Sequence, residues 1–256
     1  MIVIHCLLSS QCKKAGDVAL CHAHCYAYLK LHGASGKGGL LGHTGIPVAY
    51  AKVTANRLPF KSDNPEAHQL VFAYCQNVLQ RVTEGVGLYL YSVPNSVNPK
   101  GTGTGKTTAA VAILHAYLVA RTIQHVKRTK PIFQLPALFV NASTFQNRFN
   151  AQFRGPREMQ EKAAVAFYEC KIDMAQAELL VLDDVGVREA TEAYRNEFYE
   201  VIDHRCANQK ATILTSNEPL EPIARLLDPR IASRIGGMTI PVSFEGEDQR
   251  NRAMLG

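Results

Sequence analysis

The sequence lacks the features of a membrane-embedded or secreted protein. No uninterrupted apolar run approaches the ~18 to 20 residues that a membrane span requires. The first residues have neither the basic opening nor the apolar stretch of a secretory signal. Internal repeats and low-complexity tracts, apart from one glycine-rich stretch, are also missing. We therefore expect a cytoplasmic protein with no membrane partner.

The overall composition is that of an ordinary globular chain with a small excess of positive charge. The 256 residues are 46% hydrophobic and 20% charged, and the formal net charge is +6. A chain of this length can form one full-sized core and a small additional module. The excess of positive charge is compatible with contact to nucleic acid or nucleotide, but proteins with neither function reach the same value.

Cysteine is concentrated at the N-terminus. The chain has seven cysteines, an odd number, and four of them fall within the first 25 residues. In a chain that is not exported, such a cluster indicates a metal site before it indicates disulfides. Four thiolates suffice for a tetrahedral zinc site, and zinc would supply the folding energy that so short a segment lacks. The predicted Zn²⁺ ligands are Cys6, Cys12, Cys21 and Cys25.

Two alternatives to this zinc site stay open. His5, His22 or His24 could replace one of the cysteines, because the spacing between the first two cysteines is wider than in a common zinc knuckle. Free thiols in a small apolar module are the other alternative. The glycine-rich stretch at residues 33–42 is interpreted as a linker. It divides the chain into an N-terminal module at residues 1–45 and a second domain at residues 46–256.

The second domain alternates apolar runs with segments of helical periodicity. This alternation predicts parallel strands joined by helices, with both faces of the sheet covered, which is a three-layer α/β sandwich. Pro65 is suited to the first position of a helix, and Ser143 could cap another. The expected strands are residues 88–91, 135–140, 179–182, 212–215 and 238–244, and the expected helices include residues 107–125 and 191–208.

A phosphate-binding loop is predicted between the first of these strands and the helix that follows it. Its glycines let successive backbone N–H groups converge on phosphate oxygens, and the helix N-terminus adds partial positive charge. Lys106 is expected to reach the β- and γ-phosphates of ATP, and the Thr107 hydroxyl to bind Mg²⁺. The predicted ATP-binding residues are Gly101, Thr102, Gly103, Thr104, Gly105, Lys106, Thr107 and Thr108.

The spacing of this loop departs from the usual pattern at one position. Lys100 stands where the first glycine is expected, and Gly101 follows one place later. The opening turn must therefore be built differently. A flexible loop without a ligand is the alternative interpretation.

Two acids follow a buried-type strand, and a polar triplet follows the next one. Ligands of parallel α/β sheets bind where the strands end. We expect Asp183 to hold Mg²⁺, directly or through water, and Asp184 to orient or deprotonate the attacking water. Asn217 could hydrogen-bond that water or the γ-phosphate. Because Asp184 is shorter than the Glu found there in many related ATPases, hydrolysis is expected to be slow.

Arginines near the C-terminus are candidates for contact with nucleotide. Arg230 and Arg234 are four residues apart and so share a helix face. An arginine offered to the γ-phosphate of a neighbouring subunit contributes about 10³ to 10⁵ in rate in the GTPases where it is understood. A solvated basic face is the alternative. Arg250 is interpreted either as a nucleotide sensor or as part of a frayed tail.

From Ile46 onward the chain resembles the DnaC/IstB group of AAA+ ATPases, of the phage and bacterial helicase-loader type. The matching features are Ile46-Pro47 with Tyr50, the loop at residues 101–108, residues 179–186, the triplet at residues 215–217, and Ser233-Arg234. The resemblance implies that Asp183 and Asp184 form the Walker B pair, Asn217 the first sensor, Arg234 the arginine finger and Arg250 the second sensor.

The same resemblance implies a function and partners. Members of this group bind a replicative, DnaB-type hexameric helicase and place it on single-stranded DNA, with ATP as the switch. A homo-oligomer, or a ring or spiral on the helicase, is expected. Two clusters are hypothesised to contact DNA, because channels for single strands combine cations with aromatic rings. They are Lys127, Arg128 and Lys130, and then Arg148, Phe149, Phe153, Arg154 and Arg157.

Three other functions remain as alternatives. An IstB-like transposition helper ATPase would have the same fold. A non-hydrolysing adaptor would use nucleotide only to order a DNA or protein interface, and Lys100 and Asp184 favour this more than usual. A small-molecule P-loop kinase is the least favoured, since nothing in the sequence indicates an acceptor site or lid.

Overall fold

The fold is built on five parallel strands. A computed structural model describes residues 5–17, 19–22 and 24–248. Within these, the strands form one sheet in the order β2-β3-β4-β1-β5, so that β4 lies between β1 and β3. The strands are β1 (Gly87–Ser92), β2 (Ala137–Asn141), β3 (Leu179–Val185), β4 (Thr212–Ser216) and β5 (Thr239–Phe244).

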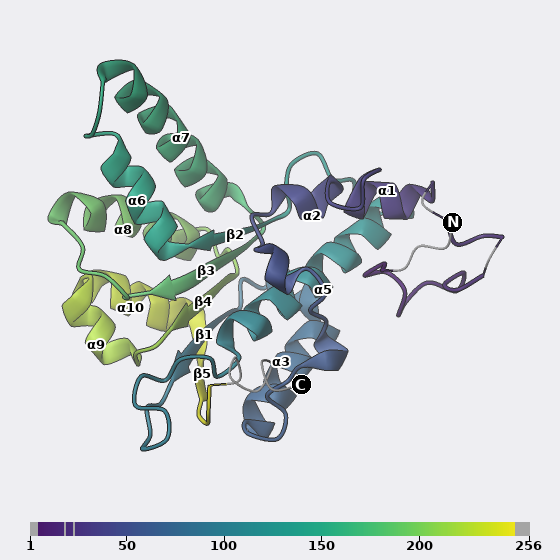
Figure 1. The fold of residues 1–256 in the computed structure, drawn as a ribbon, viewed down its shortest axis with the longest axis horizontal. Coiled ribbons are helices and arrows are strands. Elements are labelled where there is room, and N and C mark those ends of the chain that lie inside the picture. The colour runs from purple at the N-terminus through teal and green to yellow at the C-terminus, as the bar shows by residue number, and fades with distance from the viewer. Residues whose placement is uncertain (1–4, 18, 23, 249–256) are drawn as a thin grey trace.

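Helices cover both faces of the sheet (Figure 1), and this confirms the predicted three-layer α/β fold. Alternate strand residues point to opposite faces: Leu88 and Leu90 lie in one core, and Tyr89 lies in the other. The first face packs against α3 (Pro65–Gln76), α4 (Val78–Thr83) and α5 (Lys106–Val126). The second packs against α6 (Ala142–Ala151), α7 (Arg157–Gln176), α8 (Glu192–Ala207), α9 (Leu220–Leu226) and α10 (Pro229–Met238).

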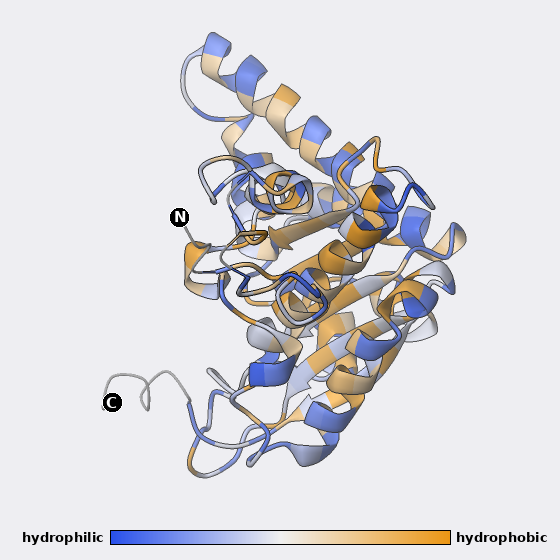
Figure 2. Cartoon of the chain, turned by 90° about the vertical axis from the view of Figure 1, so that its right-hand side faces the viewer, coloured by the Kyte–Doolittle hydropathy of each residue, from blue (hydrophilic) through white to orange (hydrophobic). Residues whose placement is uncertain are grey.

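Helix α5 is the central helix of the first core. It is long and apolar enough to cross a membrane by length and composition alone, yet 67% of its most apolar window is buried inside the fold. Figure 2 shows hydrophobic residues concentrated along the sheet and the helices that lie on it, with hydrophilic residues on the outer turns. The apolar character of α5 is therefore explained by packing against the sheet.

Some local predictions need correction. Pro65 begins a helix as expected, but this helix, α3, ends before Asn77, and a second helix, α4, follows. Ser143 does not cap the helix after β2. That strand continues to Asn141, whose Oδ1 accepts a hydrogen bond from the Thr144 N–H at 3.1 Å, so Asn141 is the cap.

The N-terminal segment packs onto the sheet domain. It contains α1 (Tyr26–His32), α2 (Gly39–His43) and the 3₁₀ turns η1 (Val48–Tyr50) and η2 (Ala55–Arg57). The stretch interpreted as a linker is partly helical, since α2 overlaps its second half. Leu31 and Leu40 are buried in the same core as α5. Tyr26 also reaches the end of α5, with its hydroxyl 3.0 Å from His125 Nε2.

Candidate nucleotide-binding site

The phosphate loop connects the end of β1 to the start of α5, as the sequence predicts. Lys106 begins the helix and is 5% exposed. Its Nζ donates to Ser92 Oγ at 2.5 Å, to the Gly101 carbonyl at 3.0 Å and to Thr104 Oγ1 at 3.4 Å. These contacts hold the ammonium group inside the loop, so positive charge is available where a phosphate would lie.

The opening turn of the loop is built around Asn98 instead of a first glycine. The buried Asn98 side chain accepts from the Thr102 N–H at 3.2 Å and donates to the Thr102 carbonyl at 2.7 Å. Gly101 has φ +58°, and a Cβ there would lie 2.6 Å from the Cβ of Ser92. The glycine requirement has therefore moved by one position, and Lys100 is exposed.

The first acid of β3 lies directly opposite the loop. Asp183 Oδ1 accepts hydrogen bonds from the Thr107 and Thr215 hydroxyls, both at 2.8 Å. Burial raises the pKa of Asp183, and the charge of Asp184 raises it further, whereas the hydroxyl donors lower it. The structure thus brings together the predicted magnesium ligands Thr107 and Asp183 across the gap between α5 and β3.

A β-bulge in β3 sets the positions of the two acids. Asp183 and Asp184 together lie opposite one residue of β4, Thr215, because the register between the strands shifts there. Asp184 adopts φ +58°, and its N–H donates to Thr215 Oγ1 at 2.9 Å. A single hydroxyl therefore fixes both acids, one through its carboxylate and the other through its backbone. Sequence reasoning found the acids but missed Thr215 in this role.

The remaining predicted residues all follow β4 in the chain. Asn217 follows β4 and so lies at the same sheet edge as Asp183, because β4 runs beside β3. Arg234 is exposed on α10, and its Nε donates to Asp203 of α8 at 2.8 Å. The guanidinium of Arg230 pairs with Asp228 and lies over the Tyr199 ring. Arg250 lies outside the described residues.

The residues present fit a nucleoside triphosphate with Mg²⁺. The loop offers backbone N–H groups, the helix N-terminus and the Lys106 ammonium to phosphate. Thr107 and Asp183 supply hydroxyl and carboxylate oxygens, the hard ligands that Mg²⁺ prefers. Their separation of 2.8 Å lets both oxygens face one ion after a small displacement.

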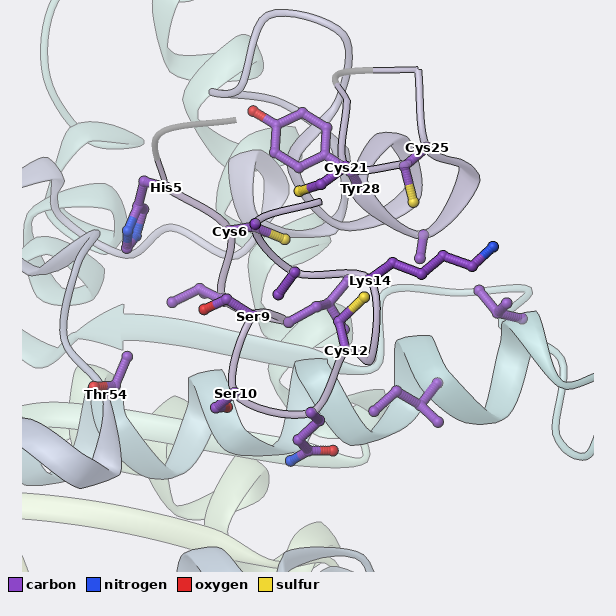
Figure 3. Close-up of a pocket in the computed structure, with 18 of the residues that line it drawn as sticks. His5, Cys6, Ser9, Ser10, Cys12, Lys14, Cys21, Cys25, Tyr28 and Thr54 are labelled. Atoms are coloured by element: carbon purple, nitrogen blue, oxygen red, sulfur yellow. The ribbon is translucent and has the colours of Figure 1, made fainter. Parts of the chain in front are cut away.

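The four N-terminal cysteines line one cavity, but the structure gives the zinc prediction no support. The cavity has a volume of about 750 Å³, and Figure 3 shows sulfur atoms of Cys6, Cys12, Cys21 and Cys25 on its walls. Burial raises the pKa of the Cys6 thiol, and the three other thiols raise it further. Among the described residues, no three Cys, His, Asp or Glu side chains form a group able to hold a metal ion.

The predicted DNA-binding residues fall on two surfaces. Arg148, Arg154 and Arg157 are exposed on α6, α7 and the turn between them, which project from the sheet as a pair in Figure 1. Phe153 is 65% exposed beside them, whereas Phe149 is buried in the second core. Lys127, Arg128 and Lys130 follow α5, and Lys130 pairs with Glu178 at 3.4 Å.

The parallel sheet, the loop between β1 and α5 and the acids on β3 have the layout of the P-loop fold that AAA+ proteins share. Residues 157–236 match the family model of the IstB-like ATP binding protein. The replicative helicase loader DnaC of Escherichia coli (strain K12) is 23% identical over 151 residues, which are 59% of this chain and 54% of that protein. These matches confirm the resemblance to DnaC/IstB-type AAA+ proteins.

Solved structures show the same fold. The crystal structure of DnaI superposes with a TM-score of 0.56 at 18% identity, covering 78% of this chain and 95% of that one. The crystal structure of the DnaC helicase loader superposes with a TM-score of 0.55 at 22% identity, covering 77% and 99%. The sequence match to DnaC, by contrast, spans about half the length of that relative.

Proposed function

We propose that this protein is an ATP-dependent, DnaC-like helicase loader that acts in DNA replication. The observation that carries the proposal is the 2.8 Å contact between Thr107 Oγ1 and Asp183 Oδ1. Through this contact the end of the phosphate loop lies against the first acid of β3. The similarity to DnaC supports the loader role and the link to replication, since that relative is by its name a replicative helicase loader.

In this proposal each residue of the site has one role. The loop N–H groups and Lys106 bind the phosphates, and Thr107 and Asp183 hold Mg²⁺, which supplies charge neutralisation when bound. Asp184 orients the attacking water or accepts its proton, and Asn217 hydrogen-bonds that water or the γ-phosphate. Hydrolysis is slow, because the short side chain of Asp184 reaches less far than a glutamate.

Arg234 is proposed to act on the nucleotide of a neighbouring subunit. It lies on the surface of α10, with its side chain 48% exposed, and it would leave its contacts with Asp203 and Tyr199 to reach a nucleotide. A homo-oligomer, or a ring or spiral on the helicase, would bring Arg234 to the next phosphate loop. Arg250 is proposed as a second nucleotide sensor.

The projecting pair α6–α7 is the proposed contact for single-stranded DNA. Arg148, Arg154 and Arg157 offer cations to phosphates, and the exposed ring of Phe153 offers a surface on which a base can stack. A DnaB-type hexameric helicase in the cytoplasm is the proposed protein partner. The basic residues after α5 are a second, separate hypothesis for DNA contact.

A loading assay tests this function. The protein would be mixed with a candidate DnaB-type helicase, bubble DNA and ATP, and unwinding and helicase retention on DNA would be measured. ATP-dependent loading is expected for the natural protein and its loss for Lys106→Ala, while Lys100→Ala retains loading. If no plausible helicase is loaded in the presence of ATP, the loader proposal is wrong.

Two alternatives have a specific observation behind them. The IstB-like family model matches residues 157–236, which favours a transposition helper. Co-purification with a transposase, without a helicase, would establish the transposition-helper function. The short acid Asp184 favours a non-hydrolysing adaptor. ATP turnover measured with and without single-stranded DNA distinguishes it, since Asp184→Asn abolishes turnover only if the natural protein hydrolyses ATP.

A further inference from the structure

The chain that follows β5 runs back across the phosphate loop. We call residues 245–248 the C-terminal strap. Its first residue, Glu245, exchanges two hydrogen bonds with the side chain of Asn64, at 2.7 and 2.9 Å. The Gly246 carbonyl accepts from Asn98 Nδ2 at 3.0 Å. Asn98 is also the residue that builds the opening turn of the loop, so one side chain holds the loop and the strap together.

The last described residue of the strap lies on the phosphate loop itself. Asp248 Oδ2 accepts from the Thr102 hydroxyl at 3.2 Å. A Cβ on Gly103 would collide with the carboxylate of Asp248, so this carboxylate occupies the space that the glycine leaves open. In a phosphate loop, the absence of a side chain at such a position lets an anion approach the backbone.

We propose that the C-terminal strap covers the phosphate loop, with the Asp248 carboxylate at a position that a phosphate would take, and that bound nucleotide and the strap compete for this position. The proposal rests on the nucleotide-binding role given to the loop above. A carboxylate and a phosphate are both anions that accept hydrogen bonds, and two such anions beside one loop repel each other. Both cannot occupy the open side of Gly103 at once.

This displacement gives nucleotide a mechanical consequence outside the loop. Expelling Asp248 pulls on Gly246 and Glu245, whose partners Asn98 and Asn64 lie before α5 and before α3. Nucleotide binding at the loop would therefore change the contacts of the strap at the surface formed by α3 and the end of β5.

Nucleotide affinity of charge-neutral variants tests the proposal. Asp248→Asn keeps the size of the side chain and removes its charge. Because the competing anion is lost, the variant is expected to bind ATP and ADP about fivefold to twentyfold more tightly than the natural protein. Glu247→Gln is the matched control: it removes the same charge from the adjacent, exposed residue and is expected to leave the affinity within about twofold.

Hydrogen exchange of the full chain gives an independent readout. Amides of residues 245–248 are expected to exchange faster when ATP or ADP is bound, and faster in Asp248→Asn even without nucleotide. Unchanged or weaker binding by Asp248→Asn, or slower exchange of the strap on nucleotide binding, would overturn the proposal. If neither the natural protein nor the variants bind nucleotide, the proposed function itself falls, which is a distinguishable result.

Discussion

The hydroxyl of Thr215 donates a hydrogen bond to the Asp183 carboxylate at 2.8 Å. The same oxygen accepts the N–H of Asp184. Replacing Thr215 by valine, which has the same shape, removes both contacts and leaves the part-buried N–H of Asp184 without this partner. We expect Thr215→Val to lower the rate of ATP hydrolysis about tenfold to a hundredfold. Nucleotide affinity is expected to change much less, because the phosphate loop is intact.

Steady-state hydrolysis and equilibrium binding of a fluorescent nucleotide measure the two effects separately. Thr122→Val is the control, since Thr122 is another buried threonine whose hydroxyl bonds only within helix α5, to the Leu118 carbonyl. Equal hydrolysis rates in Thr215→Val and the natural protein would show that the bulge does not need this hydroxyl.

The displaced glycine of the phosphate loop gives a second prediction. Gly101→Ala adds a Cβ at φ +58° and 2.6 Å from the Cβ of Ser92, so the opening turn must move. We expect at least about a tenfold loss of nucleotide affinity. Lys100→Gly restores the usual glycine at an exposed position and is expected to leave affinity within about twofold. Isothermal titration with ADP measures both, and the opposite ranking would contradict the account of the turn.

Contiguous patterns made the core of this site predictable from the sequence. The strand before the loop, the helix after it and the acids at the end of β3 are each encoded by a short run of residues with one periodicity. Asn98, Ser92 and Asp248 could not be found in this way. Asn98 and Asp248 contact residues distant in sequence, Gly246 and Thr102, and Ser92 contacts Lys106 from the far end of the loop. Each is an ordinary polar residue in its own segment.

Helix α7 was missed for a different reason. A helix is recognised when its apolar residues gather on one buried face, but α7 also leaves Val165, Tyr168 and Ile172 about half exposed. Apolar residues therefore lie on both its buried side, as Phe167 and Met174 do, and its solvent side, so the pattern of polarity does not distinguish the two sides. The helix is defined by its packing against α6 and α8, which a single sequence does not display.

The buried histidine of α1 predicts a pH dependence of stability. Burial, together with the neighbouring His5 and His115, lowers the pKa of His32 from 6.5 to about 4, and His32 Nε2 accepts a hydrogen bond from the Leu7 N–H. The unfolded chain binds the proton more readily, so folded stability falls as the pH drops from about 6.5 toward 4. The loss from this group is up to about 3 kcal/mol.

Urea unfolding at several pH values measures this dependence. His32→Gln retains a side-chain acceptor but does not titrate, so its stability is expected to fall less steeply between these pH values than that of the natural protein. His43→Gln, at an exposed position, is the control and is expected to keep the natural slope. An unchanged slope in His32→Gln would remove His32 as the source.

The fully buried Arg205 gives the last prediction, which concerns stability. Its guanidinium donates to Thr212 Oγ1 and to the carbonyls of Met174, Ala177 and Ala211, at 2.6 to 2.9 Å, and so joins the end of α7 to the start of β4. Arg205→Met fills much of the volume but leaves these acceptors without donors. We expect a loss of roughly 3 kcal/mol or more in the free energy of unfolding, against a change within about 0.5 kcal/mol for the exposed Arg154→Met. Urea denaturation measures both, and equal stability of the two variants would mean that water replaces the guanidinium at these acceptors without cost.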